Sequence, residues 1–258
     1  MKPLLALVLA LPSLALANSP LDGTWVGVTS SLKLPDKPDV YVLSQGWFEC
    51  KSCTPAYRIK ADGTDQTVPG YAYYDTMAVQ TVDAHTVKLT ARKSGKVSLQ
   101  ETLSVSEKGD SLKDSFEDDT QAHPVTGSNL ATRVAARPHG AHAISGSWRT
   151  TKVEDVSQNG MTTTVKTTDN GISVRFGNGG GYDAQFDGKD YPMIGDLGHT
   201  VVALKRLDPY TVEETDKQDG KPVAVVRVKV ASDGKTADFQ ANDLRNGTTT
   251  RMKLIKQE

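Results

Sequence analysis

The sequence predicts an all-β protein built from two tandem antiparallel β-barrels of about eight strands each. Three features of the chain predict this fold: an internal repeat, a close succession of turns, and alternating polarity between the turns. The second half repeats the first at a shift of 125 residues, without a gap between positions 57 and 109. Alternation of apolar and polar residues is typical of strands with one buried face.

Identical residues recur at equivalent positions along both halves of the chain. Turn residues and strand starts coincide at Tyr57, Asp62, Gly63 and Gly70 and at Tyr182, Asp187, Gly188 and Gly195. Upstream, Trp25 and Trp148 each close a Gly-x-Trp tripeptide, here at a shift of 123 residues. We therefore expect a first barrel repeat at 21–137 and a second at 144–258, since each has the size of a small domain. The segment 138–143 between them contains proline and glycine without strand alternation, and we expect it to be a linker.

Strands of the first repeat are expected between its glycine turns, at 24–32, 40–49, 55–61, 71–82, 86–93, 96–105, 112–117 and 129–135. Seven or eight turns in the second repeat, many of them Asn-Gly or Asp-Gly, imply about eight strands there too, because glycine accepts the positive φ of hairpin turns. The connections are uniformly short, which favours an up-and-down barrel over a two-sheet sandwich.

Alternation also predicts which side chains fill the barrels. It is clearest at 99–105 and at 226–230, where apolar residues alternate with polar or charged ones. In the first barrel we expect an interior formed by Trp25, Leu89, Leu99, Leu103 and Val105. In the second barrel the corresponding residues are Trp148, Val226, Val228 and Val230.

The N-terminal segment has the pattern of an export signal. Lys2 supplies a positive charge, residues 4–11 form a short apolar core, and a small-x-small pattern predicts cleavage after Ala17. The segment 1–17 is therefore expected to be removed, and the mature protein to be periplasmic or secreted. The apolar core is too short to span a bilayer, and no later segment is long enough either, so no membrane span is expected.

Charge and composition argue against a nucleic-acid partner. Lysine and arginine number 30 against 31 aspartate and glutamate, and the two signs are mixed along the chain. No strongly basic face is expected, and such a face is what binding to a phosphate backbone requires.

Cys50 and Cys53 are the two cysteines of the chain. In an exported protein, two cysteines three positions apart are expected to form a disulfide, here across a turn. A thioredoxin-like redox pair is a weaker alternative, because the pair lies between strands and not at a helix N-terminus. A metal site that adds His139 and His142 is a further alternative, although these histidines lie far away in the sequence.

No arrangement of residues in the chain indicates catalysis. Serines and carboxylates are plentiful, but none occurs in a nucleophile elbow of the Gly-x-Ser-x-Gly type. The sequence therefore predicts a protein that is not an enzyme and has no catalytic residues, no cofactor and no bound metal.

The Gly-x-Trp tripeptides resemble the first-strand signature of lipocalins. The segment Phe186-Asp187-Gly188-Lys189-Asp190-Tyr191-Pro192 further resembles uncharacterised exported bacterial lipocalin-like β-barrel proteins, here as a tandem duplication. The resemblance implies that Trp25 and Trp148 plug the closed ends of the barrels. It also implies an arginine from the last strand lying across each tryptophan, for which Arg133 and Arg251 are the candidates.

Two functions follow from these expectations. The first is a non-enzymatic, exported lipocalin-like protein that binds a small apolar ligand inside one or both barrels. The alternative is a structural or protein-interaction module of the cell envelope without a ligand pocket, anchored on another envelope protein by exposed aromatic side chains. Candidate anchors are Trp47, Phe48, Tyr71, Tyr73 and Tyr74. A cavity of a few hundred Å³ would favour the first function and a filled barrel the second.

Overall fold

The computed structural model describes residues 19–258, and this part of the chain is almost entirely β. Twenty strands and one short helix, α1 (Gln158–Met161), make up its regular structure. The expected signal segment 1–17 and its cleavage site lie outside the described residues. Among the residues described, no helix is long and apolar enough to cross a membrane.

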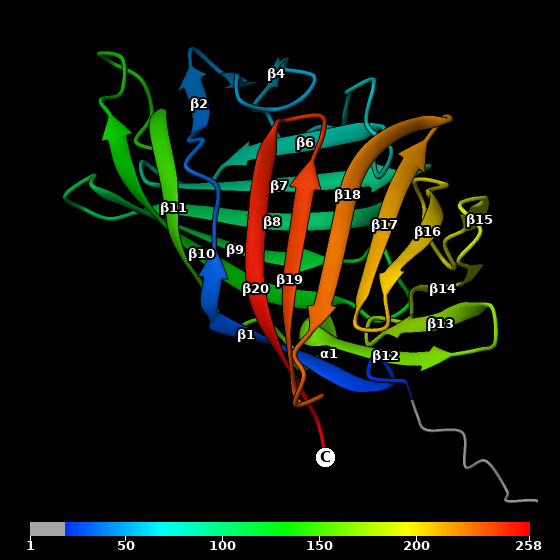
Figure 1. The fold of residues 1–258 in the computed structure, drawn as a ribbon. Coiled ribbons are helices and arrows are strands. Elements are labelled where there is room, and N and C mark those ends of the chain that lie inside the picture. Colours follow the sequence, from blue (N-terminus) through cyan, green and yellow to red (C-terminus); the bar gives the residue numbers. More distant parts are fainter. Residues whose placement is uncertain (1–18) are drawn as a thin grey trace, which may run out of the picture.

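The strands form two antiparallel sheets of ten strands, each curved into a nearly closed barrel (Figure 1). The first barrel contains β2 (Asp39–Ser44), β3 (Trp47–Cys50), β4 (Tyr57–Lys60), β5 (Gln66–Thr67), β6 (Thr76–Thr81), β7 (Thr86–Lys93), β8 (Lys96–Val105), β9 (Ser111–Asp118), β10 (Val125–Ala135) and β11 (Gly146–Glu154). The second contains β1 (Gly23–Lys33), β12 (Thr162–Thr167), β13 (Gly171–Phe176), β14 (Gly181–Gln185), β15 (Asp190–Pro192), β16 (Val201–Asp208), β17 (Thr211–Gln218), β18 (Lys221–Val230), β19 (Thr236–Asp243) and β20 (Thr248–Lys256). The predicted fold of two antiparallel barrels is confirmed.

Each barrel has ten strands, and not the expected eight. The chain contains hairpin turns at places where the alternation of apolar and polar residues predicts one continuous strand. The segment 40–49 was expected to be one strand, but Gln45 and Gly46 both have positive φ, of 51° and 74°, and separate β2 from β3. Very short strands such as β5 add to the number. At the open seam, single bridges bring the sheet ends together, between Asp62 and Gln80 in the first barrel and between Gly181 and Ile194 in the second.

The two barrels exchange their first strands. β1 pairs with β12 and β20 of the second barrel, and β11 pairs with β2 and β10 of the first. Figure 1 shows the blue strand β1 beside the red strand β20. The domain boundaries 21–137 and 144–258 remain a prediction about the repeated unit. In the structure the first barrel is formed by one continuous segment, 39–154, whereas the second combines β1 with the segment 162–256.

Because of this exchange, each tryptophan packs in the barrel opposite to the one expected. Trp25 belongs to the core of the second barrel, with Leu21 and Val230, and Trp148 belongs to the core of the first. The expectation that Trp25 lies in the first barrel and Trp148 in the second is therefore wrong. Of the other predicted interior residues, Leu89, Leu103 and Val105 are buried in the first barrel and Val230 in the second.

The expected linker 138–143 is partly buried. Ala141 and Ala143 are 7% and 4% exposed, and the backbone N–H of His142 donates a 2.9 Å hydrogen bond to the carbonyl of Leu43. The imidazole Nε2 of His142 lies 2.6 Å from the carbonyl oxygen of Asp83. The linker therefore packs against the first barrel and carries the chain into β11.

Direct contacts join the two barrels along their length. Asn159 Nδ2 donates a 2.8 Å hydrogen bond to the carbonyl of Pro124, which ties the segment of α1 to the loop before β10. On another side, Gln218 at the end of β17 donates to the hydroxyls of Tyr73 and Thr200 at 3.3 and 3.1 Å. Tyr73, one of the candidate interface anchors, is thus used within the molecule.

Candidate ligand-binding cavity

Trp148 is fully buried in the core of the first barrel and is held there by polar contacts. Its indole Nε1 donates a 2.7 Å hydrogen bond to the carbonyl of Ile144, four residues earlier. The guanidinium carbon of Arg133 lies 4.0 Å from the centroid of the indole ring, in a cation–π contact. Nη2 of Arg133 also donates a 2.7 Å hydrogen bond to the carbonyl of Ala143, so one side chain fixes both the ring and the linker.

The second barrel repeats this arrangement with a lysine in place of the arginine. Trp25 Nε1 donates a 2.9 Å hydrogen bond to the carbonyl of Leu21. Lys256 Nζ lies 4.8 Å from the centroid of the Trp25 ring and donates a 3.1 Å hydrogen bond to the carbonyl of Pro20. Lys256 occupies the position equivalent to Arg133 at the shift of 123 residues. The candidate Arg251 lies elsewhere, and its Nε donates to Oε1 of Gln240 at 3.0 Å.

A cavity of about 380 Å³ lies inside the second barrel, and Trp25 forms part of its wall. Strands β1, β12 to β14 and β17 to β20 contribute to its walls, together with α1. Most of its lining is aliphatic, aromatic or thioether in character, from Leu21, Trp25, Met161, Val165, Ile172, Val174, Phe176, Met193, Val212, Val226, Val228, Val230, Phe239, Met252 and Leu254. Its volume falls within the usual range for pockets that hold small organic molecules.

Three of the five methionines of the chain line this cavity, namely Met161, Met193 and Met252. Gly27 makes room for two of them, because a Cβ at this position would come within 2.5 Å of the Met161 methyl and 2.7 Å of the Met252 methyl. Methionine side chains adapt to ligands of different shape, since they are unbranched and flexible. This part of the wall is therefore suited to follow the outline of a bound molecule.

Two carboxyl groups on β17 interrupt the apolar lining. Glu214 and Asp216 follow Val212 at every second position, so all three side chains point into the barrel. The hydroxyl of Tyr182 donates a 2.6 Å hydrogen bond to Oε2 of Glu214. Oδ1 of Asp216 is buried without a hydrogen-bond partner. The lining of the cavity includes no lysine, arginine or histidine.

Burial changes the acidity of both groups. It raises the pKa of Glu214 well above the usual range, and the neighbouring Asp216 raises it further. The pKa of Asp216 is also raised by burial, and to a smaller extent by the charge of Asp196. The pair therefore retains a proton more readily than carboxyl groups in water, since two adjacent buried negative charges repel each other.

The interior of the first barrel differs from that of the second, because aromatic side chains fill it. Tyr41, Phe48, Tyr57, Tyr71 and Tyr74 form a continuous series of rings, with successive centroids 4.4 to 6.2 Å apart. Phe48, a candidate interface anchor, is fully buried in this series. The duplicated units have thus diverged into one barrel with a packed interior and one with a cavity.

Each barrel nevertheless has a glutamate in its interior. The glutamate occupies one of two positions that face each other on adjacent strands, and these two positions are equivalent in the two repeats. In the first barrel Glu101 on β8 faces Leu89 on β7, and in the second Glu214 on β17 faces Val226 on β18. At the shift of 125 residues, Glu214 matches Leu89 and Val226 matches Glu101. The acid and the aliphatic residue have exchanged strands. Burial, together with the charges of Asp114 and Asp39, raises the pKa of Glu101 to about 8.

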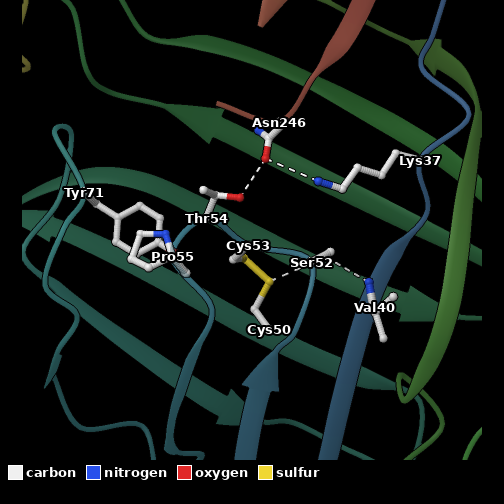
Figure 2. The surroundings of a disulfide bond; sticks show 9 residues. All are labelled: Lys37, Val40, Cys50, Ser52, Cys53, Thr54, Pro55, Tyr71 and Asn246. Carbon is white, nitrogen blue, oxygen red and sulfur yellow. Dashed lines mark hydrogen bonds between the residues drawn. A yellow bond between two sulfur atoms is a disulfide. The ribbon is translucent and has the colours of Figure 1, made fainter. Parts of the chain in front are cut away.

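The predicted disulfide between Cys50 and Cys53 is confirmed, with the Cα atoms 5.4 Å apart (Figure 2). It closes the turn after β3, and the Ser52 hydroxyl within this turn accepts a 2.9 Å hydrogen bond from the backbone N–H of Val40. Thr54 donates a 2.7 Å hydrogen bond to Oδ1 of Asn246 of the other barrel. The disulfide therefore fixes a turn that contacts the second barrel. The alternative of a metal site that includes Cys50 and Cys53 is wrong, because both sulfur atoms are bonded to each other.

Comparisons of the chain with protein-family models, with curated proteins and with solved structures find no match. Of the predicted binding residues, Trp25 lines the cavity, Arg133 and Trp148 meet in the other barrel, and Arg251 joins neither group. The sequence reasoning did not identify Glu214 and Asp216, although their alternation with Val212 places them on the buried face of β17.

Proposed function

We propose that this protein is an exported, non-enzymatic lipocalin-like carrier that holds a small apolar ligand in its second barrel. The observation that supports the proposal is the cavity of about 380 Å³, which is lined almost entirely by apolar side chains, among them the buried Trp25. Burial of apolar ligand surface in such a cavity contributes about 25 cal/mol for each Å² removed from water.

The first barrel is proposed to serve as a scaffold for this site. Its aromatic interior leaves the barrel packed, and its loops contact the second barrel beside the cavity. Gly160 of α1 packs so closely on Val125 that a Cβ would lie 2.5 Å from that valine's methyl group. Asn159 is tied to the carbonyl of Pro124 by the hydrogen bond described above. The first barrel thus supports the helix whose Met161 lines the cavity.

Native mass spectrometry of the mature protein, isolated from cells that export it, tests the carrier function. A stoichiometric small molecule that is retained by the wild type and lost from Val226→Trp is the expected result, because the larger side chain fills the cavity. Val97→Trp is the control, since Val97 belongs to the first barrel and does not line the cavity. A protein that carries no molecule, and whose mass is unchanged after exposure to fatty acids, alcohols and amines, would contradict the proposal.

The packed interior of the first barrel favours the alternative function for that barrel, as a module that binds an envelope protein. The proposal separates the two barrels by function: the second binds the ligand and the first supplies contacts. Cross-linking of the exported protein in intact cells, followed by identification of the partner, would test this second role.

A further inference from the structure

The two carboxyl groups in the cavity lack a cationic partner. Within residues 19–258, neither Glu214 nor Asp216 takes part in an ion pair. The neighbouring acid Glu213 points out of the barrel and pairs with Arg227 at 2.5 Å. The outer face of β17 is therefore neutralised, whereas its inner face presents acids to an apolar cavity.

Buried acids of this kind are costly unless a donor or a cation pairs with them. Tyr182 supplies one donor to Glu214, but Oδ1 of Asp216 receives none. The other polar groups do not meet this need: Thr163 contributes one uncharged hydroxyl to the cavity lining, and Asp196 adds a further negative charge near Asp216. The pair thus lacks a hydrogen-bond donor that carries positive charge.

We propose that the ligand is an apolar amine whose nitrogen donates hydrogen bonds to Glu214 and Asp216 and whose hydrocarbon body occupies the aliphatic part of the cavity. This inference rests on the proposed carrier function and specifies its ligand class. An ammonium group offers several N–H donors and a full positive charge, so it satisfies both carboxyl groups at once. A fatty acid would bring a third carboxyl group against them, and the resulting repulsion disfavours its binding.

Affinities for three ligands with the same ten-carbon chain test the head-group preference: decylamine, decanol and decanoic acid. Isothermal titration calorimetry at neutral pH, below the micelle concentration of each ligand, gives the dissociation constants. We expect decylamine to bind at least tenfold more tightly than decanol, and decanoic acid to bind most weakly. Equal affinities for the amine and the alcohol, or tightest binding of the acid, would overturn the inference and leave the carrier function standing. If none of the three binds, both proposals fail.

Variants assign the preference to the two acids. Glu214→Gln/Asp216→Asn retains the shape of the side chains but removes their charge, and it is expected to bind decylamine and decanol with equal affinity. Glu213→Gln is the matched control, since it removes the same charge one residue away on the outer face. It is expected to keep the full preference for the amine. Unchanged decanol affinity in the double variant shows that its cavity is intact, and a persisting amine preference in that variant would overturn the inference.

Discussion

The hydroxyl of Tyr182 and the carboxylate of Glu214 meet at 2.6 Å inside the second barrel. Tyr182 comes from β14 and Glu214 from β17, so the hydrogen bond crosses the barrel interior between strands that are not neighbours in the sheet. Tyr57 is the counterpart of Tyr182 in the first barrel, where burial and, to a smaller extent, the charge of Glu101 raise the pKa of this tyrosine. Both repeats have therefore retained a tyrosine beside an interior glutamate.

Tyr182→Phe is expected to weaken the second barrel and its affinity for amines. Loss of the donor removes an interaction that favours the charged form of Glu214, so the pKa of that carboxyl rises further. We expect the free energy of unfolding to fall by about 1–2 kcal/mol, because a buried acceptor loses its partner. Urea denaturation checks this value, and decylamine titrations at neutral pH check the affinity. Tyr191→Phe, which removes a 3.2 Å hydrogen bond at the exposed Asp187, is the control and is expected to change both quantities little.

Arg133→Ala is expected to destabilise the protein more than Lys256→Ala, although the two residues are equivalent in the repeats. Arg133 donates hydrogen bonds to the carbonyls of Gly109, Ser145 and Ala143 and covers Trp148, whereas Lys256 donates to Pro20 alone and covers Trp25 at a longer distance. We expect losses of about 3 and about 1 kcal/mol, respectively, from the net value of each hydrogen bond and cation–π contact. Equal losses in urea denaturation would show that the additional hydrogen bonds of Arg133 contribute nothing.

Stability is expected to fall as the pH rises from about 4.5 to about 8, the interval between the ordinary pKa of a glutamate and that of Glu101 in the folded state. Over this interval the folded protein holds a proton that the unfolded chain has released, so a higher pH favours unfolding. Glu101→Gln is expected to remove this contribution and to make the protein more stable than the wild type at about pH 9, where the buried carboxylate of the wild type is charged. Denaturation curves across this pH range measure the effect. The exposed Glu117→Gln is the control, and a Glu101→Gln profile parallel to that of the wild type would refute the prediction.

Engineered cysteines test the strand exchange. Thr24 on β1 is paired with Thr164 on β12, and their hydroxyl oxygens lie 3.1 Å apart. Thr24→Cys/Thr164→Cys is therefore expected to form a disulfide within one chain, which peptide mapping by mass spectrometry identifies. Without exchange, Thr24 would take the place of its counterpart Ser147, which pairs with Ala135. Efficient cross-linking in Thr24→Cys/Ala135→Cys, and none in the first variant, would show that the strands are not exchanged.

Local patterns in the sequence were sufficient to predict the barrels but not their assembly. Alternation and turn glycines predicted most strands, because they depend on neighbouring residues alone. The exchange of β1 and β11 could not be predicted, since both strands carry the same Gly-x-Trp tripeptide and each fits either barrel. It is determined by long-range pairing that leaves no local signal.

The cavity was only partly foreseeable from the sequence. Val226, Val228 and Val230 were expected inside the second barrel and do line it, but their alternation does not show whether a barrel is filled or hollow. The difference arises from the aromatic rings of the first barrel, which come from several loops and strands. The lipocalin resemblance implies an arginine beside Trp25, whereas the chain has Lys256 there, at the position that matches Arg133 in the repeat.

Methyl NMR of the methionines measures ligand binding in the second barrel most directly. Met161, Met193 and Met252 line the cavity, whereas Met77 is buried in the core of the first barrel. Saturation with decylamine is predicted to shift the methyl signals of the three cavity methionines and to leave that of Met77 unchanged. Signals that stay unchanged at all four positions, or a shift at Met77 alone, would contradict a ligand site inside the second barrel.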